Sequence, residues 1–354
     1  MPRLPPSLIW RARSISPHAA TLLPVCRDIP SALTELRWIR EHVESTPSPT
    51  HPASIRLDQL CKRRGKGIPL QYVLGTQPFG SLELQCRPGV LIPRPEPEAY
   101  STHLGHLLLA NPSLIPLPPS KTLRILDFCT GTGCIALLLY SHLSSPSSPL
   151  QRLNITGVDI SPLAISLSKL NLTHNISLGA LAASTQDKSI SFIQSSIFSP
   201  DWMSEAQDAK CDILISNPPY ISPRGFNTDV ARSVRNYEPK LAQVPEPQHT
   251  HHPYSQKEGV RQEDIFYARL LDIGAVQRPT VMLFETGGMD QAKRVVEMAA
   301  EKLGVDEWKM EIWRDWPDGR PEEEEETAMR IDGLGDVKVK GSGHGRSVFI
   351  YRRK

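Results

Sequence analysis

The spacing of apolar residues predicts helices near the start of the chain. Between residues 28 and 66, apolar side chains such as Leu33, Leu36 and Ile39 recur three or four positions apart, and the Pro- and Ser-rich stretch 45–50 interrupts the pattern. This spacing is typical of amphipathic helices that bury one face. We therefore predict a small helical domain over residues 28–66. Residues 67–95 alternate between apolar and polar positions, which predicts a β-hairpin linker.

Beyond residue 96, short apolar runs alternate with helical patterns. The segments 125–128, 153–160, 190–194 and 211–216 are mostly apolar, as in parallel strands that are buried on both faces. This alternation predicts an α/β catalytic domain over residues 96–354. Further strands are expected near 336–340 and 346–351, as a pair that completes the sheet. The stretches 144–150 and 243–262 lack apolar periodicity, and we expect loops there.

A glycine-containing turn follows the first of these strands. It reads Cys129-Thr130-Gly131-Thr132-Gly133 and leads into an apolar helix. Glycine lets the backbone approach a ligand closely, and the start of a helix offers free N–H groups. The third glycine of the dinucleotide fingerprint is missing, so the turn favours a nucleoside over a pyrophosphate and makes a nicotinamide-dependent oxidoreductase improbable.

Two more strand ends carry candidate ligand-binding residues. Asp159 ends the second strand, where a carboxylate can accept hydrogen bonds from both hydroxyl groups of a ribose. The alternative is that Asp159 only caps the next helix. Ser196 and Ile197 follow the third strand, where an adenine ring is expected. Because the carboxyl ends of parallel strands meet at one edge of a sheet, these three ends together predict a nucleoside site.

The tetrapeptide Asn217-Pro218-Pro219-Tyr220 directly follows the fourth strand. Such a tetrapeptide is the acceptor-holding signature of amino-methylating enzymes. The side-chain carbonyl of Asn217 and the backbone carbonyl of Pro218 could accept both N–H bonds of an amide or aryl amine, which would point its nitrogen at an electrophilic methyl group. Pro219 would fix the backbone, and Tyr220 would pack on the substrate. Taken alone, the tetrapeptide is equally consistent with a simple turn.

These motifs, with three further segments, resemble one family: the HemK/PrmC-type protein-glutamine N5-methyltransferases of release factors, in their mitochondrial, fungal-like branch. Residues 68–98 are similar to the family's linker and the start of its catalytic domain, and 237–242 and 283–287 match further family positions. The resemblance covers most of residues 20–350. It implies a class I S-adenosylmethionine-dependent methyltransferase fold, with a Rossmann-like seven-stranded sheet and an N-terminal helical domain that helps to recognise the protein substrate.

The resemblance also implies a reaction. S-adenosylmethionine would be the cofactor, and the methyl group would go to the glutamine side-chain amide of the Gly-Gly-Gln motif in a class-1 peptide chain release factor, which is the expected partner. The catalytic residues would be Asn217, Pro218, Pro219 and Tyr220. The cofactor-binding residues would be Cys129, Thr130, Gly131, Thr132, Gly133, Asp159, Ser196, Ile197 and Asn217. No strong base is required if the proton leaves after the methyl group has moved, because the positively charged N-alkylated amide formed at that point is very acidic. Catalysis would then depend on alignment and local electrostatics.

Some positions depart from the family pattern. Cys129 stands where the family usually has Gly, Pro97 where it has Thr, and Ser196 where it has an Asp near the adenine, so weaker cofactor contacts are expected. Residues 243–262 replace a short Gly-rich turn. Two alternatives stay open. A DNA or RNA amino-methyltransferase would share Asn-Pro-Pro-Tyr, and a catalytically inactive module that docks a release factor would accommodate the departures.

Composition agrees with a two-domain enzyme. The chain has 354 residues, enough for a sizeable core, and its net charge of +2 gives no reason to expect a nucleic-acid partner. The basic run 62–66 and the acidic run 322–326 are interpreted as solvated. Six cysteines without paired spacing are expected to be reduced, and no metal site is expected.

The amino terminus resembles a targeting segment. Four arginines precede Asp28, the first acidic residue, and apolar residues stand among them. A mitochondrial presequence over residues 1–27 is therefore expected, with a disordered tail as the alternative. No run is long enough for a membrane helix. We expect a monomer in the mitochondrion, or otherwise in the cytoplasm, without a membrane partner.

Overall fold

The computed structural model describes residues 3–111, 114, 122–145, 148–199, 210–246 and 260–353. The chain forms two compact units. The first comprises Met1–Thr76, Cys86–Pro88 and Ala231–Glu238, and the second comprises Gln77–Gln85, Gly89–Val230 and Pro239–Lys354. Among the described residues, none of the helices is both long and apolar enough to cross a membrane. The expected loop at 243–262 lies largely outside these residues, as do positions 146 and 147 of the loop at 144–150.

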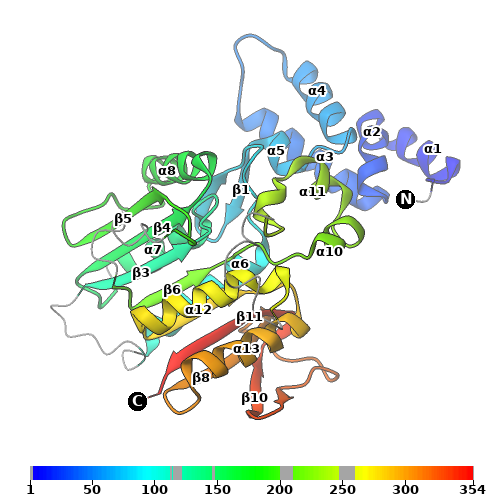
Figure 1. Cartoon of the computed structure of the whole chain (residues 1–354). Coiled ribbons are helices and arrows are strands. Elements are labelled where there is room, and N and C mark those ends of the chain that lie inside the picture. The colour runs from blue at the N-terminus through cyan, green and yellow to red at the C-terminus, as the bar shows by residue number, and fades with distance from the viewer. Residues whose placement is uncertain are drawn as a thin grey trace. The chain divides into compact units, whose positions relative to one another are not determined.

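The first unit is built from helices (Figure 1). They are α1 (Pro6–Ile15), α2 (Pro17–Cys26), α3 (Ile29–Ser45), α4 (Ala53–Gly65), α5 (Leu70–Leu74) and α11 (Arg232–Tyr237). The side chain of Asp28 caps α3 by accepting a hydrogen bond from the Ser31 amide at 2.7 Å. The apolar face of α3 buries Leu36 and Ile39 in one core with Cys61 of α4. The helical spacing read from the sequence therefore corresponds to α3 and α4.

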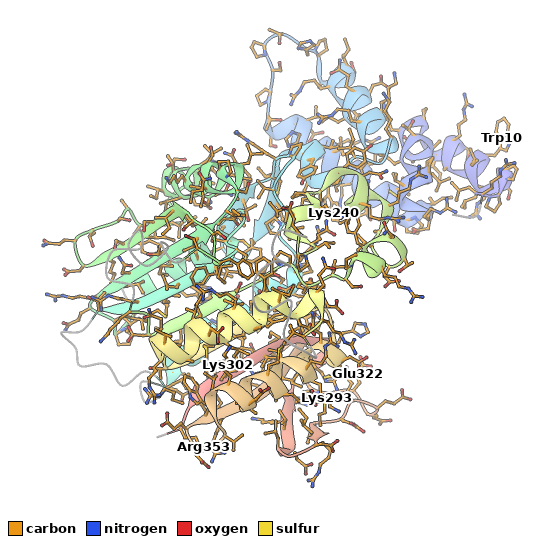
Figure 2. The ribbon with its side chains drawn as sticks, in the orientation of Figure 1. Trp10, Lys240, Lys293, Lys302, Glu322 and Arg353 are labelled. Atoms are coloured by element: carbon orange, nitrogen blue, oxygen red, sulfur yellow. The ribbon has the colours of Figure 1, made fainter. Side chains whose placement is uncertain are left out.

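Helices α1 and α2 occupy most of the range that was considered for a presequence. In α2, Ala19, Leu22 and Leu23 have no exposed surface, and Ala19 and Leu22 belong to the core that α3 and α4 form. By contrast, α1 buries only Ala12, and Trp10 is 70% exposed (Figure 2). Helix α2 is therefore part of the core of the unit, whereas α1 contributes little to it.

A hairpin and a group of short helices accompany the sheet. The hairpin consists of β1 (Thr76–Phe79) and β2 (Leu82–Gln85), so its strands occupy only the middle of the expected range 67–95. Side-chain oxygens of Asn175 and Asn171 accept hydrogen bonds from the backbone of β2 at Glu83 and Gln85, at 3.0 and 2.7 Å. The short helices are α10 (Pro223–Thr228), η1 (Lys240–Ala242) and η4 (Gln262–Asp264).

The second unit contains one large sheet. Its strands are β3 (Leu123–Phe128), β4 (Leu153–Asp159), β5 (Lys188–Gln194), β6 (Ile213–Ser216), β7 (Val281–Glu285), β8 (Trp308–Trp316), β9 (Ala328–Ile331), β10 (Gly335–Lys340) and β11 (Ser342–Arg352). Their order is β5-β4-β3-β6-β7-β11-β8-β10-β9. The five strands from β5 to β7 in this order are parallel to one another, and β11 runs antiparallel to both β7 and β8. The α/β fold class is confirmed.

Two details of the expected sheet are wrong. Among the described residues, the sheet has nine strands instead of the expected seven, because β10 and β9 extend it beyond β8. The strand at 336–340 does not pair with the strand at 346–351. Since β7 and β8 occupy both edges of β11, β10 pairs in parallel with the other edge of β8.

Helices cover both faces of the sheet and divide its core in two. On one face, α6 (Pro95–Ala110), α7 (Cys134–Ser144) and α8 (Pro162–Ser177) pack on residues such as Ile213 and Ile215. On the other, α12 (Ile265–Gln277) and α13 (Met289–Leu303) pack on residues such as Leu214 (Figure 1). Successive residues of β6 thus point to opposite faces and are buried on both. With both faces covered, the carboxyl edge of the parallel strands is the place for a site.

Candidate active site

One pocket lies at the carboxyl ends of the parallel strands. It is lined by residues that follow β3, β4, β5 and β6. Of the residues expected to bind the cofactor, the pocket brings together Cys129, Thr130, Gly131, Thr132, Asp159, Ser196, Ile197 and Asn217. Pro219 also lines it. Four segments that are distant in sequence therefore contribute to one cavity.

The glycine turn keeps one side of this pocket open. Gly131 has a φ of 55°, and a Cβ at this position would meet no heavy atom within 4 Å. The turn is held in place by Thr130, whose hydroxyl donates to Asp127 Oδ2 at 2.6 Å and whose amide donates to the Val158 carbonyl. An open backbone surface beside a fixed turn is what a closely approaching ligand requires.

Gly133 has a different role from the one expected. It does not line the pocket; it precedes the first residue of α7, with a φ of 79°. A Cβ there would lie 3.0 Å from both Phe192 and Ser168. Gly133 is therefore required for packing between α7, β5 and α8, and it does not contact the cavity.

Asp159 is held by backbone amides. Its Oδ2 accepts a hydrogen bond from Gly131 and its Oδ1 accepts one from Ser161, both at 2.9 Å. Burial raises the pKa of this carboxyl group, while these hydrogen bonds lower it. The helix-cap alternative is wrong, because the cap of α8 is the Ser161 hydroxyl, which accepts from Ala164. Each Asp159 oxygen has a further lone pair with which it can accept a hydrogen bond from a hydroxyl group of a ligand.

The remaining wall of the pocket is apolar. Ile197 and Phe198 follow β5, and Phe198 meets the ring of Phe266 edge to face, with 5.0 Å between ring centroids. The Ser196 hydroxyl accepts a hydrogen bond from the Phe198 amide at 3.2 Å, so it shapes its own loop. Phe266 comes from α12, and nothing in the local sequence marked it. Apolar surfaces of this kind suit a flat heteroaromatic ring.

The acceptor tetrapeptide is only partly exposed to the pocket. Asn217 and Pro219 line it, whereas Pro218 is buried outside the lining. Tyr220 also lies outside the lining, and its hydroxyl donates to Glu285 Oε1 at 3.1 Å. At the start of the tetrapeptide, the Ser216 hydroxyl donates to the Phe128 carbonyl at 2.8 Å, which ties β6 to the end of β3.

Sequence reasoning missed part of the lining. Residues 89–94 form one side of the pocket, together with Pro97, and Val90 anchors them by packing against Ala164 and Leu167 of α8. Pro239, Leu241 and Ala242 form another side. Both segments belong to the parts of the sequence that resemble the family, and both line the pocket.

Comparisons with known proteins show which family the chain belongs to. A family model described as N-6 DNA Methylase matches residues 107–255. The mitochondrial MRF1 N(5)-glutamine methyltransferase of Saccharomyces cerevisiae is 38% identical over 70% of this chain and 69% of its own length. A Schizosaccharomyces pombe protein named as a probable MRF1 mitochondrial N(5)-glutamine methyltransferase is 32% identical over 68% of this chain and 72% of its own length. The chain belongs to the release factor N5-glutamine methyltransferase family.

Bacterial relatives match a shorter part of the chain. The release factor glutamine methyltransferase of Mycolicibacterium smegmatis is 35% identical over 55% of this chain and 57% of its own length. Among solved structures, the N-terminal domain of human METTL16 in complex with SAH has a TM-score of 0.43 and 14% identity, and covers 90% of this chain and 92% of that one. The human METTL16 catalytic domain in complex with an RNA hairpin has a TM-score of 0.44 and 13% identity, and the match covers 98% of this chain and 91% of that one.

As a member of this family, the protein is a methyltransferase whose cofactor is S-adenosylmethionine. The pocket fits that group. The open backbone at Gly131 and the fixed carboxylate of Asp159 suit its polar parts, and the apolar wall suits its adenine. Among the described residues, no group of three or more His, Cys, Asp or Glu side chains could hold a metal ion.

Proposed function

We propose that this protein methylates the side-chain amide nitrogen of the glutamine in the Gly-Gly-Gln motif of a class-1 peptide chain release factor in the mitochondrion. The names of its relatives in both yeasts support the substrate and the compartment, since both refer to mitochondrial MRF1. One structural observation carries the chemistry: Asn217 of the acceptor tetrapeptide lines the same pocket as the glycine turn and Asp159.

The chain's own residues would act by orientation. When bound, S-adenosylmethionine supplies an electrophilic methyl group. The side-chain oxygen of Asn217 accepts a hydrogen bond from one N–H of the glutamine amide, and the Pro218 carbonyl accepts one from the other N–H. These two hydrogen bonds turn the nitrogen toward the cavity. Asp159 holds the ribose hydroxyls, and the turn Cys129–Gly133 borders the methionine portion. Ser196 and Ile197 lie beside the adenine.

The other parts of the chain have proposed roles as well. The helical unit, which includes residues 28–66, recognises the protein substrate, and the hairpin within 67–95 links it to the catalytic domain. The protein acts as a monomer, without a membrane or nucleic-acid partner. A presequence within residues 1–27 directs it to the mitochondrion.

Mass spectrometry of a release factor incubated with the protein and S-adenosylmethionine tests the proposal. We expect the Gly-Gly-Gln peptide to gain the mass of one methylene unit, and Asn217→Ala to abolish the gain. Asn227→Ala is the matched control, because it removes an exposed amide of the same type from α10, outside the pocket. No gain with the wild-type protein, despite measured cofactor binding, would overturn the proposed substrate. No cofactor binding would favour the inactive docking module.

The match to the N-6 DNA Methylase model supports a second candidate, an amino-methyltransferase of nucleic acid. Both reactions place a nitrogen with a delocalised lone pair next to an Asn-Pro-Pro-Tyr segment. A DNA or RNA oligonucleotide in the same assay separates them, since each function predicts methyl transfer to only one of the two substrates.

A further inference from the structure

Glu285 lies behind the acceptor tetrapeptide and binds it through Tyr220. It ends β7, its side chain is 3% exposed, and it takes no part in the pocket lining. Its two carboxylate oxygens accept hydrogen bonds from two tyrosines on different elements. Tyr220 donates to Oε1 at 3.1 Å, and Tyr100 of α6 donates to Oε2 at 2.9 Å. The hydroxyl of Tyr267 donates to the backbone carbonyl of Glu285 at 2.6 Å.

The segment after Glu285 holds Tyr220 at two more points. Gly287 lies against the ring, so that a Cβ there would be 3.1 Å from Tyr220 Cδ2. The side-chain amide of Gln291 donates to the Tyr220 carbonyl at 3.3 Å. Gln291 is itself fixed, since it accepts from the Gly287 amide and donates to Asp264, each at 2.8 Å.

The tetrapeptide depends on anchors of this kind. Pro218 and Pro219 have no backbone N–H, so neither can be fixed by donating a hydrogen bond. On the amino-terminal side, Ser216 is fixed by the strand and by its bond to Phe128. On the carboxyl-terminal side, the first groups that can be held are those of Tyr220, followed by the Ile221 amide, which donates to Gln243 at 2.8 Å.

We propose that Glu285 is a positioning residue for the acceptor site: its carboxylate fixes the Tyr220 hydroxyl and thereby sets the position of Asn217 and the Pro218 carbonyl relative to the pocket. The inference rests on the proposed function, in which those two groups hold the substrate amide. Glu285 touches neither substrate nor cofactor, and it acts through Tyr220.

The charge state of Glu285 matters for this role. As a carboxylate it accepts both tyrosine hydroxyls, whereas a protonated carboxyl group must donate one hydrogen itself. Burial raises the pKa of Glu285 to about 7, and hydrogen bonds from the tyrosines and the nearby Arg346 oppose that rise. Glu96 adds to the rise, and Arg346 also donates to Asp315 at 2.7 Å. Alignment is therefore expected to improve as the pH rises through about 7.

Three single variants of the full chain test the proposal kinetically. Glu285→Gln and Tyr220→Phe should each lower kcat by about tenfold or more, because small misplacements of reacting groups are costly, while the cofactor Kd and the KM for the release factor change little. Tyr100→Phe is the matched control. It removes the hydroxyl that donates to the other oxygen of the same carboxylate. At a pH well above 7, where Glu285 is a carboxylate in both proteins, it should leave kcat within about twofold. The kcat of wild type should rise with pH through about 7, and that of Glu285→Gln should not.

A second readout does not depend on turnover. Hydrogen exchange of the Ile221 amide should become faster in Glu285→Gln and Tyr220→Phe and stay unchanged in Tyr100→Phe, with the cofactor bound in every case. Unchanged exchange and unchanged kcat in Glu285→Gln would overturn the proposal, as would an equal loss in Tyr100→Phe. If wild type methylates no release factor, the proposed function fails, and the exchange rates still decide whether Glu285 fixes the tetrapeptide.

Discussion

At the scale of single residues, Cys129 is a place where the chain accepts a local cost. It has a φ of 60°, which residues other than glycine rarely adopt, and it lines the pocket at the carboxyl edge of the sheet. A left-handed conformation costs about 1–2 kcal/mol for a residue with a Cβ. Relief of that cost should offset the lost packing in Cys129→Gly, so its free energy of unfolding should stay within about 1 kcal/mol of wild type. Cys211→Gly removes a side chain of the same size that is 5% exposed and has no such strain, and it should be clearly less stable in urea.

Asp127 is the second residue whose environment makes a prediction. It has no exposed surface, and its Oδ1 lacks a hydrogen-bond partner among the described residues. Burial raises its pKa from 3.8 to about 7. Because the folded pKa is above the unfolded one, the stabilising contribution is present below pH 3.8 and is lost as the pH rises through about 7. Asp127→Asn should therefore gain stability relative to wild type between pH 4 and 7, as measured by urea unfolding. A difference that is constant over this range would contradict the prediction.

At the scale of elements, the sequence predicted those strands whose residues are mostly buried. The strands β3, β4 and β6 are mostly buried, β5 is buried at Ile190 and Phe192, and residues such as Asp159 and Asn217 stand at the strand ends. Both the strands and the edge that carries the pocket could therefore be predicted. Pairings between distant segments could not, because local patterns contain no information about which edge of β8 is free. The acidic run 322–326 is exposed as expected except at Glu325, whose contact could not be predicted for the same reason. Glu325 accepts a hydrogen bond from the Gly343 amide at 2.7 Å, and that partner is distant in sequence.

The amino-terminal helices give a prediction at this scale. Removal of residues 1–16 deletes α1, which buries little, whereas removal of residues 1–27 also deletes Leu22 and Leu23 from the core. Burial of each leucine is worth about 1.5–3 kcal/mol. We expect the shorter truncation to fold with nearly the wild-type Tm and the longer one to lose several degrees or fail to fold. Equal Tm values would show that α2 contributes nothing to the core. A presequence compatible with this fold would end before α2.

At the scale of the whole molecule, the net charge of +2 conceals an uneven distribution. The helical unit contains 14 of the 40 Lys and Arg residues and 6 of the 38 Asp and Glu residues, so it carries +8 and the catalytic unit −6. The near-neutral total therefore does not describe either unit. If the basic unit recognises the release factor, raising the salt concentration should increase the KM for that substrate, because salt screens exposed charges. The cofactor Kd should change less, since its pocket lies within the catalytic unit.

Two matched charge reversals locate the effect. Arg37 on α3 and Lys293 on α13 are both exposed cations in i,i+4 pairs, with Glu41 and Glu297 respectively (Figure 2 labels Lys293). Such pairs contribute little to stability, so both reversals should fold. Arg37→Glu should raise the KM for the release factor severalfold and weaken its salt dependence, because it removes attraction at the basic unit. Lys293→Glu changes the total charge by the same amount and should leave both quantities unchanged. Equal effects would mean that the net charge of the molecule, and not the helical unit, attracts the substrate.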